Sequence, residues 1–174
     1  MGDLMRRRRS RHLVNDSVSR MAQALVWKTP LPDNANFDDL CHAVAELHGR
    51  RLVFDEIRNT TLRVTTGVLF EAESFTGILV PAHDSGYYCL LSKVHELCHL
   101  VIRSAPESWF SADAPRPRQP MSNSRQFLRL CPRNSAESND ADSVYEELVV
   151  EAMARAFMRR LAVYADTTEE EHFA

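Results

Sequence analysis

The segment at residues 95–99, HELCH, constrains this chain more than any other feature of its sequence. Residues four apart lie one above the other on a helix, so His95 and His99 can reach a single metal ion if the segment is helical. Glu96 is turned by about 100° round such a helix. Its carboxylate would therefore lie beside a water on the metal rather than on the metal itself. The spacing predicts a metal-binding helix.

Zinc is the metal that we expect on this pair of ligands. Zn²⁺ accepts imidazole nitrogens at about 2.0–2.1 Å and keeps one position for water in catalytic sites. We therefore expect Zn²⁺ on His95 and His99, with Glu96 as the catalytic residue that takes a proton from the water and delivers it to the leaving amine. The residue that stabilises the oxyanion stays open among Tyr87, Tyr88, Tyr145 and the arginines of the loop at residues 104–142.

A third protein ligand is expected on a later helix. Glu151 is the only charge in the apolar run at residues 148–154, and a carboxylate on an apolar face is costly unless a metal or a cation compensates it. We therefore expect Glu151 to be the third ligand. Two alternatives stay open: Glu147, one turn earlier on the same stripe, is the rival ligand, and Glu151 could instead pair with Arg155 at i+4.

Apolar residues recur at helical spacing in two segments before the motif. The first runs from Val14 to the break at Pro30, and the second begins at Asn36, a good N-cap, and ends at Gly49. The two histidines of the second segment are six residues apart and so lie on different faces. We expect both at the surface rather than on a metal: His42 and His48.

Short β-branched or aromatic runs separated by turn residues follow the second helix, at residues 52–54, 65–70, 78–80 and 87–91. They predict a small, mostly antiparallel sheet. Ser92 can then cap the helix that carries the motif.

The stretch at residues 104–142 is rich in Pro, Ser, Asn and Asp, which predicts a long loop. Its one apolar patch is formed by Phe127, Leu128 and Leu130. The last helix should open at Ser143, in a capping box with Glu146, and end near Tyr164. We expect a single domain over residues 13–165, preceded by a basic, disordered segment at 1–12 and followed by an acidic tail at 166–174.

Composition and charge narrow the class of protein. Hydrophobic residues make up 44% of the 174 positions and charged residues 26%, which is typical of a globular domain. The net charge of −3 is small, and we expect no direct sequence-specific contact with nucleic acid. No apolar run is long enough for a membrane span, and the four cysteines form no CxxC pair. We expect a cytoplasmic protein with reduced thiols.

The motif in its setting at residues 91–102, LSKVHELCHLVI, resembles the ImmA/IrrE family of zincin metallopeptidases. The segment at residues 151–157, EAMARAF, is similar to the glutamate helix of that family and of gluzincins. The resemblance covers roughly residues 36–164. It implies a minimal α+β zincin domain, in which a small sheet packs with the HExxH helix and a C-terminal glutamate-bearing helix, and zinc is held by two histidines and a glutamate.

The resemblance also implies a function. It predicts zinc-dependent hydrolysis of a peptide bond in a specific protein substrate, with a helix-turn-helix repressor or an antitoxin as the partner. The alternative function is a non-catalytic zincin-fold binding module or toxin component that docks a DNA-binding partner. An enzyme needs the carboxylate of Glu96, whereas a docking module tolerates Glu96→Gln. The family usually has Gly at Cys98, and Asn or Asp where this chain has Met153 and Arg155.

Overall fold

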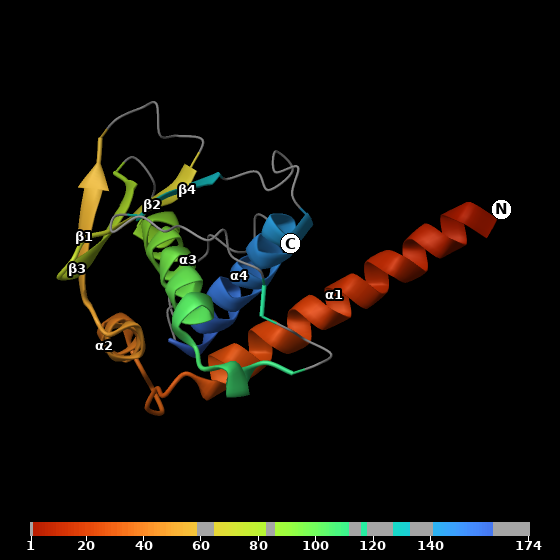
Figure 1. Ribbon diagram of the computed structural model, residues 1–174, viewed down its shortest axis with the longest axis horizontal. Helices are drawn as coiled ribbons and strands as arrows, with labels where there is room; N and C mark the ends of the chain where they lie inside the picture. Colours follow the sequence, from red (N-terminus) through yellow and green to blue (C-terminus); the bar gives the residue numbers. More distant parts are fainter. Residues whose placement is uncertain are drawn as a thin grey trace.

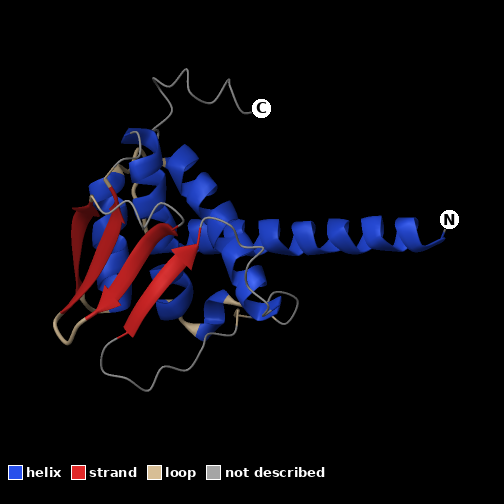
Figure 2. Cartoon of the chain, turned by 90° about the horizontal axis from the view of Figure 1, so that it is seen from above, coloured by secondary structure: helices blue, strands red, loops and turns tan. Residues whose placement is uncertain are grey.

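The computed structural model describes residues 2–58, 65–82, 86–111, 116–117, 127–132 and 141–161. Within these residues the chain forms an α+β fold in which helices cover a small sheet (Figure 1 and Figure 2). The expected fold class is thereby confirmed. The elements are α1 (Gly2–Lys28), α2 (Phe37–His48), β1 (Arg51–Ile57), β2 (Thr65–Glu71), β3 (Phe75–Pro81), α3 (Gly86–Ser104), the 3-10 turn η2 (Glu107–Trp109), β4 (Phe127–Pro132) and α4 (Ala141–Arg160).

The sheet has the strand order β1-β3-β2-β4. Strand β1 pairs in parallel with β3, whereas β2 pairs antiparallel with both β3 and β4. Antiparallel pairing therefore predominates, as expected. The central strand β3 is the most apolar, and its Ile78 and Val80 are fully buried. A β-bulge interrupts the pairing of β2 with β4 between Thr65 and Gly67.

Helix α2 begins and ends as its sequence predicts. The Asn36 side chain accepts a hydrogen bond from the Asp39 amide at 3.0 Å, and Asp39 accepts one from the Asn36 amide at 2.8 Å. Gly49 ends the helix with a φ of 72°, a left-handed conformation that favours glycine. The expectation that His48 lies at the surface is wrong, because its ring is half-buried between α3 and β3.

The expected strand at residues 87–91 is also wrong, because α3 already begins at Gly86. Tyr87, Leu90 and Val94 continue the apolar stripe at helical spacing, and packing of that stripe overrides the strand propensity of the tyrosine pair. Ser92 does not cap the helix but is buried inside it.

The stretch at residues 104–142 is not wholly a loop, since it contributes η2 and the edge strand β4. The rest of the stretch lies mostly outside the described residues. Helix α4 begins at Ala141, so Ser143 does not cap it, and Glu146 is buried instead of closing a capping box. The expected end near Tyr164 and the acidic tail lie outside the described residues.

Helix α1 is longer than expected and includes the basic segment at residues 2–12. Its N-terminal part projects away from the other elements (Figure 1 and Figure 2). The C-terminal part buries Met21, Leu25 and Val26. Arg160 of α4 donates hydrogen bonds to the carbonyls of Val26 at 2.6 Å and Leu31 at 3.0 Å, which fixes the end of α1 against α4.

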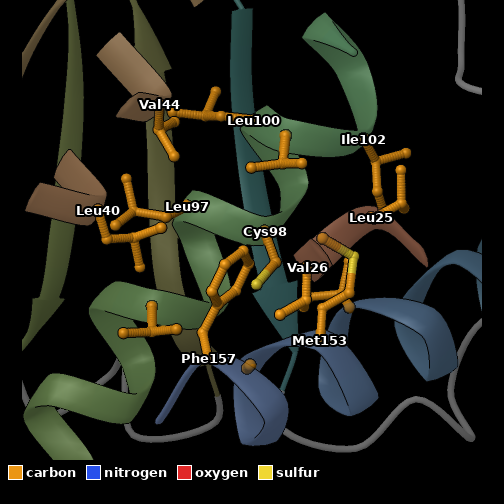
Figure 3. Packing of buried hydrophobic residues seen from close by; sticks show 14 of the residues in the cluster. Leu25, Val26, Leu40, Val44, Leu97, Cys98, Leu100, Ile102, Met153 and Phe157 are labelled. Carbon is orange, nitrogen blue, oxygen red and sulfur yellow. The ribbon is translucent and has the colours of Figure 1, made fainter. Parts of the chain in front are cut away.

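Helix α3 is the centre of the molecule. Every residue at positions 94–102 is buried, because β2 and β3 cover one side and α2 and α4 cover others. Figure 3 shows Leu97 facing Leu40 of α2, and Cys98 on the side of Met153 and Phe157 of α4. A helix buried on all sides must find partners for every polar group that it carries. Among the described helices, none has the length and apolar character needed to cross a membrane.

Candidate metal centre

Three buried side chains from two helices form a group that could hold a metal ion. His95 and His99 come from α3 and Glu147 comes from α4, and their ligand atoms all lie within 4.8 Å of one another. Their exposed fractions are 5%, 0% and 7%. Since α3 and α4 pack against each other, helix packing alone brings these three residues together.

The Nε2 atoms of both histidines are aimed at Glu147. His95 Nε2 lies 3.4 Å from Glu147 Oε2, and His99 Nε2 lies 3.4 Å from Glu147 Oε1. Both distances exceed the usual N–H···O hydrogen-bond range of about 2.7–3.2 Å. Neither buried Nε2 atom has a hydrogen-bond partner among the described residues. Two buried nitrogens without a partner beside one carboxylate are what a metal ion would satisfy.

The opposite nitrogens of the two rings are held by other glutamates of α4. His99 Nδ1 donates a hydrogen bond to Glu146 Oε1 at 2.9 Å, and both groups are buried. His95 Nδ1 lies 3.6 Å from Glu151 Oε2. In a neutral ring, a carboxylate on Nδ1 places the single proton there and leaves Nε2 with a free lone pair, which is the form that binds a metal.

Glu151, the ligand expected from the sequence, is not part of the group at the Nε2 atoms. It approaches His95 from the Nδ1 side and is 41% exposed. Its other oxygen accepts a hydrogen bond from Arg155 at 2.7 Å, which is the intrahelical pair that the sequence allows. The geometry favours Glu147, the rival, as the third ligand.

The pKa values of these groups reflect how strongly they interact. Burial would lower the pKa of His95, but its contacts with Glu147 and Glu151 and the charge of Glu96 outweigh burial and raise it to about 9. Burial would raise the pKa of Glu147, yet the two imidazoles hold it well below its usual range. The surrounding carboxylates therefore favour a positive charge at His95, which the protonated ring carries in protein without metal.

Glu96 is fully buried on α3 beside its neighbour His95. It lies outside the group formed by His95, His99 and Glu147, as its position round the helix predicts. Its charge nevertheless acts on His95, whose pKa it raises. The structure therefore brings a carboxylate that is not a candidate ligand close to the candidate ligands.

Other residues considered from the sequence have different surroundings. Cys98 lies in the core, and burial raises its pKa well above the usual value. The Tyr145 hydroxyl is 3.3 Å from Ser17 Oγ of α1. The rings of Tyr87 and Tyr88 contact each other edge to face, with centroids 5.3 Å apart.

Sequence reasoning missed Glu146 as a member of the site. The available signal was the number of acids on the last helix, because two ligand histidines need partners for their Nδ1 atoms as well as a third ligand. Three glutamates within six residues meet that need: Glu146, Glu147 and Glu151.

Comparisons of the chain with protein-family models, with curated proteins and with solved structures found no match.

Proposed function

We propose that this protein is a zinc-dependent peptidase in which His95, His99 and Glu147 hold the metal and Glu96 is the catalytic base. The spacing of the ligand atoms carries the proposal. Two ligand atoms that each lie about 2.0–2.1 Å from a tetrahedral zinc ion are about 3.3–3.4 Å apart. The Nε2 atoms of His95 and His99 lie 3.4 Å from Glu147 Oε2 and Oε1 respectively, so each nitrogen has this spacing to a different oxygen of the carboxylate.

The chemistry of the donors supports zinc over calcium and magnesium. Two imidazole nitrogens and one carboxylate are a known ligand set of catalytic zinc, which leaves a fourth position for water. Calcium and magnesium prefer sites made of oxygens alone. The fixed Nδ1 of His99, 2.9 Å from Glu146, also supports a preformed site, because its Nε2 needs no rearrangement to accept a metal.

Bound zinc would supply Lewis acidity and lower the pKa of a coordinated water toward about 7. The Glu96 carboxylate would accept a proton from the attacking water and then donate it to the leaving amine. Complete burial of Glu96 suits this role, because a carboxylate shielded from solvent returns its proton to the substrate rather than to bulk water. Glu146 would keep the His99 ring in place through both steps.

The resemblance of the HExxH helix and the later glutamate helix to the ImmA/IrrE family supports a protein substrate. We propose a helix-turn-helix regulator or an antitoxin as the substrate class. The candidate groups lie on two packed helices, α3 and α4, and groups on helices are held more precisely than groups on loops.

The first experiment measures zinc per chain by elemental analysis of the purified protein. We expect one zinc in the wild type and in Glu96→Gln, and none in His95→Ala, His99→Ala or Glu147→Gln. His42→Ala is the matched control, because His42 is an exposed histidine on α2. A wild type that neither contains zinc nor takes it up would contradict the proposal.

The second experiment tests catalysis with a mixed peptide library read by mass spectrometry. Wild type should cleave members of the library, and Glu96→Gln should reduce the rate by a factor of about 10²–10⁴ while it keeps its zinc. Equal cleavage by both proteins would assign the activity to a contaminant. Zinc binding without cleavage of peptides or of candidate regulators would favour a docking module.

A further inference from the structure

The backbone of β2 passes very close to Glu96 at Gly67. A Cβ atom on Gly67 would lie 2.6 Å from Glu96 Oε1, 2.8 Å from its Cγ and 2.9 Å from its Cδ. Unstrained contacts between carbon atoms are about 3.5–4.0 Å. The outer part of the Glu96 side chain therefore occupies the space that any side chain at position 67 would need.

Space is the reason for glycine here, rather than backbone conformation. Among the described glycines, the positive φ belongs to Gly49 and not to Gly67. Gly67 also lies at the β-bulge between β2 and β4, and bulges redirect a strand locally and are common beside active sites. Glu96 cannot turn outward to make room, because it is fully buried on the central helix.

We propose that Gly67 is a positioning residue that sets the place of the Glu96 carboxylate next to the candidate metal site, an inference that rests on the proposed role of Glu96. The strand limits the carboxylate on one side, and the neighbouring His95 lies on the metal side. An added methyl group would displace the carboxylate by about 1 Å to restore normal contacts. A displacement of that size can lower a catalytic rate by about 100-fold.

Gly77 offers a matched control in the neighbouring strand β3. A Cβ there would meet its nearest atoms, on Phe70 and Phe75, at 3.7–3.8 Å, which is an ordinary contact. Both glycines are buried in the same sheet. Gly77→Ala therefore reports what a methyl group costs in this sheet without contact with Glu96.

The test is a double-substitution cycle on protein freed of metal with a chelator, followed by urea unfolding. Gly67→Ala should lower the unfolding midpoint in the wild-type background. In the Glu96→Ala background, the decrease in midpoint caused by Gly67→Ala should be less than half as large, because Oε1, Cγ and Cδ of Glu96 are absent. Gly77→Ala should give the same small shift in both backgrounds. Equal shifts by Gly67→Ala in both backgrounds would overturn the proposal.

If Gly67→Ala does not fold, a second variant still tests whether Gly67 is required because of its contact with Glu96. The double variant Gly67→Ala/Glu96→Ala should then fold, because the clash is removed, and failure of this variant too would overturn the proposal. These measurements need neither zinc nor a substrate. Coupling of Gly67 to Glu96 would therefore stand even if the wild type cleaved nothing and the peptidase function were rejected.

A kinetic measurement separates positioning from general destabilisation. On a peptide that the wild type cleaves, Gly67→Ala should lose about 100-fold in kcat/KM with one zinc still bound per chain. Gly77→Ala, whose methyl group would make only ordinary contacts, should lose less than tenfold. An unchanged rate in Gly67→Ala, or an equal loss in Gly77→Ala, would contradict the role of Gly67.

Discussion

The middle of α3 carries two buried histidine rings, and its C-terminal end contacts the half-buried ring of His48. The two environments differ in how the ring nitrogens are satisfied. At the C-terminal end, His48 Nδ1 is 2.9 Å from Ser104 Oγ and its Nε2 is 2.9 Å from Thr76 Oγ1. In the middle, His99 Nδ1 is held by Glu146 while its Nε2 has no hydrogen-bond partner among the described residues. Complete satisfaction by neutral groups marks a structural histidine.

The two environments also favour different charge states of the histidine ring: neutral for His48 and positive for His95. Burial lowers the pKa of His48, which keeps that ring neutral. His95 is more deeply buried, yet the carboxylates around it raise its pKa to about 9. A buried site of this kind could hold a cation. The partners of the two ring nitrogens distinguish His99 from His48.

The largest expected difference between the two environments is in how zinc stabilises the folded protein: the stabilisation should depend on His99 but not on His48. Free zinc at about 1,000 times its dissociation constant should raise the free energy of unfolding by about 4 kcal/mol, because the metal binds only the folded state. His99→Ala should abolish the increase, since it removes a ligand. The measurement is urea unfolding with and without zinc.

The matched control for this prediction is His48→Ala. It should lower the stability measured without zinc but keep the increase that zinc produces, because the His48 ring is satisfied by hydroxyl groups. An increase lost in His48→Ala but kept in His99→Ala would reverse the assignment of the two regions.

The second expected effect is a loss of stability at high pH in protein freed of metal. The folded pKa of His95, about 9, is above the ordinary value of 6.5, so its stabilising contribution is complete below pH 6.5. The contribution is lost as the pH rises through 9. The difference between the two pKa values corresponds to about 3 kcal/mol. Urea unfolding at pH 6.5 and pH 9.5 measures it, and the same loss in His95→Asn would show that another group is responsible.

Features of the fold with local sequence signals were predicted correctly. Helix α2 is an example, because Asn36 and Gly49 mark its ends by short-range hydrogen bonds and backbone conformation. Strand β4 was missed because its partner, β2, lies about sixty residues earlier in the chain. Its apolar residues therefore resemble an isolated patch in a polar loop. The start of α3 was missed because tertiary packing overrides the local preference of the tyrosine pair.

The candidate site likewise has a part that depends on one helix, which sequence predicts, and a part that depends on how two helices pack, which it does not. The spacing of His95 and His99 is a property of one helix, so it can be predicted from sequence. The choice between Glu147 and Glu151 depends on how α4 docks against α3, because the two glutamates share one stripe. The apolar sequence around Glu151 suggested a partly buried carboxylate on the metal, yet the Glu151 side chain is 41% exposed and pairs with Arg155. The role of Glu146 likewise depends on the direction of the His99 ring.

The third, smaller effect is a decrease in zinc affinity when a carboxylate beside an Nδ1 atom is removed. Glu146→Gln should weaken zinc binding by about 10–100-fold, the usual effect of losing such a partner. Glu151→Gln should have a smaller effect, because its contact with His95 is 3.6 Å and partly exposed. Competition with a zinc-binding dye measures both affinities. Complete loss of zinc in Glu151→Gln, with little change in Glu147→Gln, would restore Glu151 as the third ligand.

The smallest expected effect concerns the structural histidine. Its folded pKa is lowered, first by burial and also by Arg50 and Arg103, against the opposing charge of Glu71. Below pH 6.5 the unfolded chain therefore binds a proton at His48 that the folded chain does not, and stability falls as the pH falls.

His48→Ala should cost about 1–2 kcal/mol at pH 7 through its two lost hydrogen bonds, and should remove part of the decline in stability between pH 6.5 and 5. Unfolding of metal-free wild type and variant across this range measures both effects. An equally steep decline in the variant would show that the carboxylates alone produce it, and that His48 differs from His95 in its contacts but not in its titration.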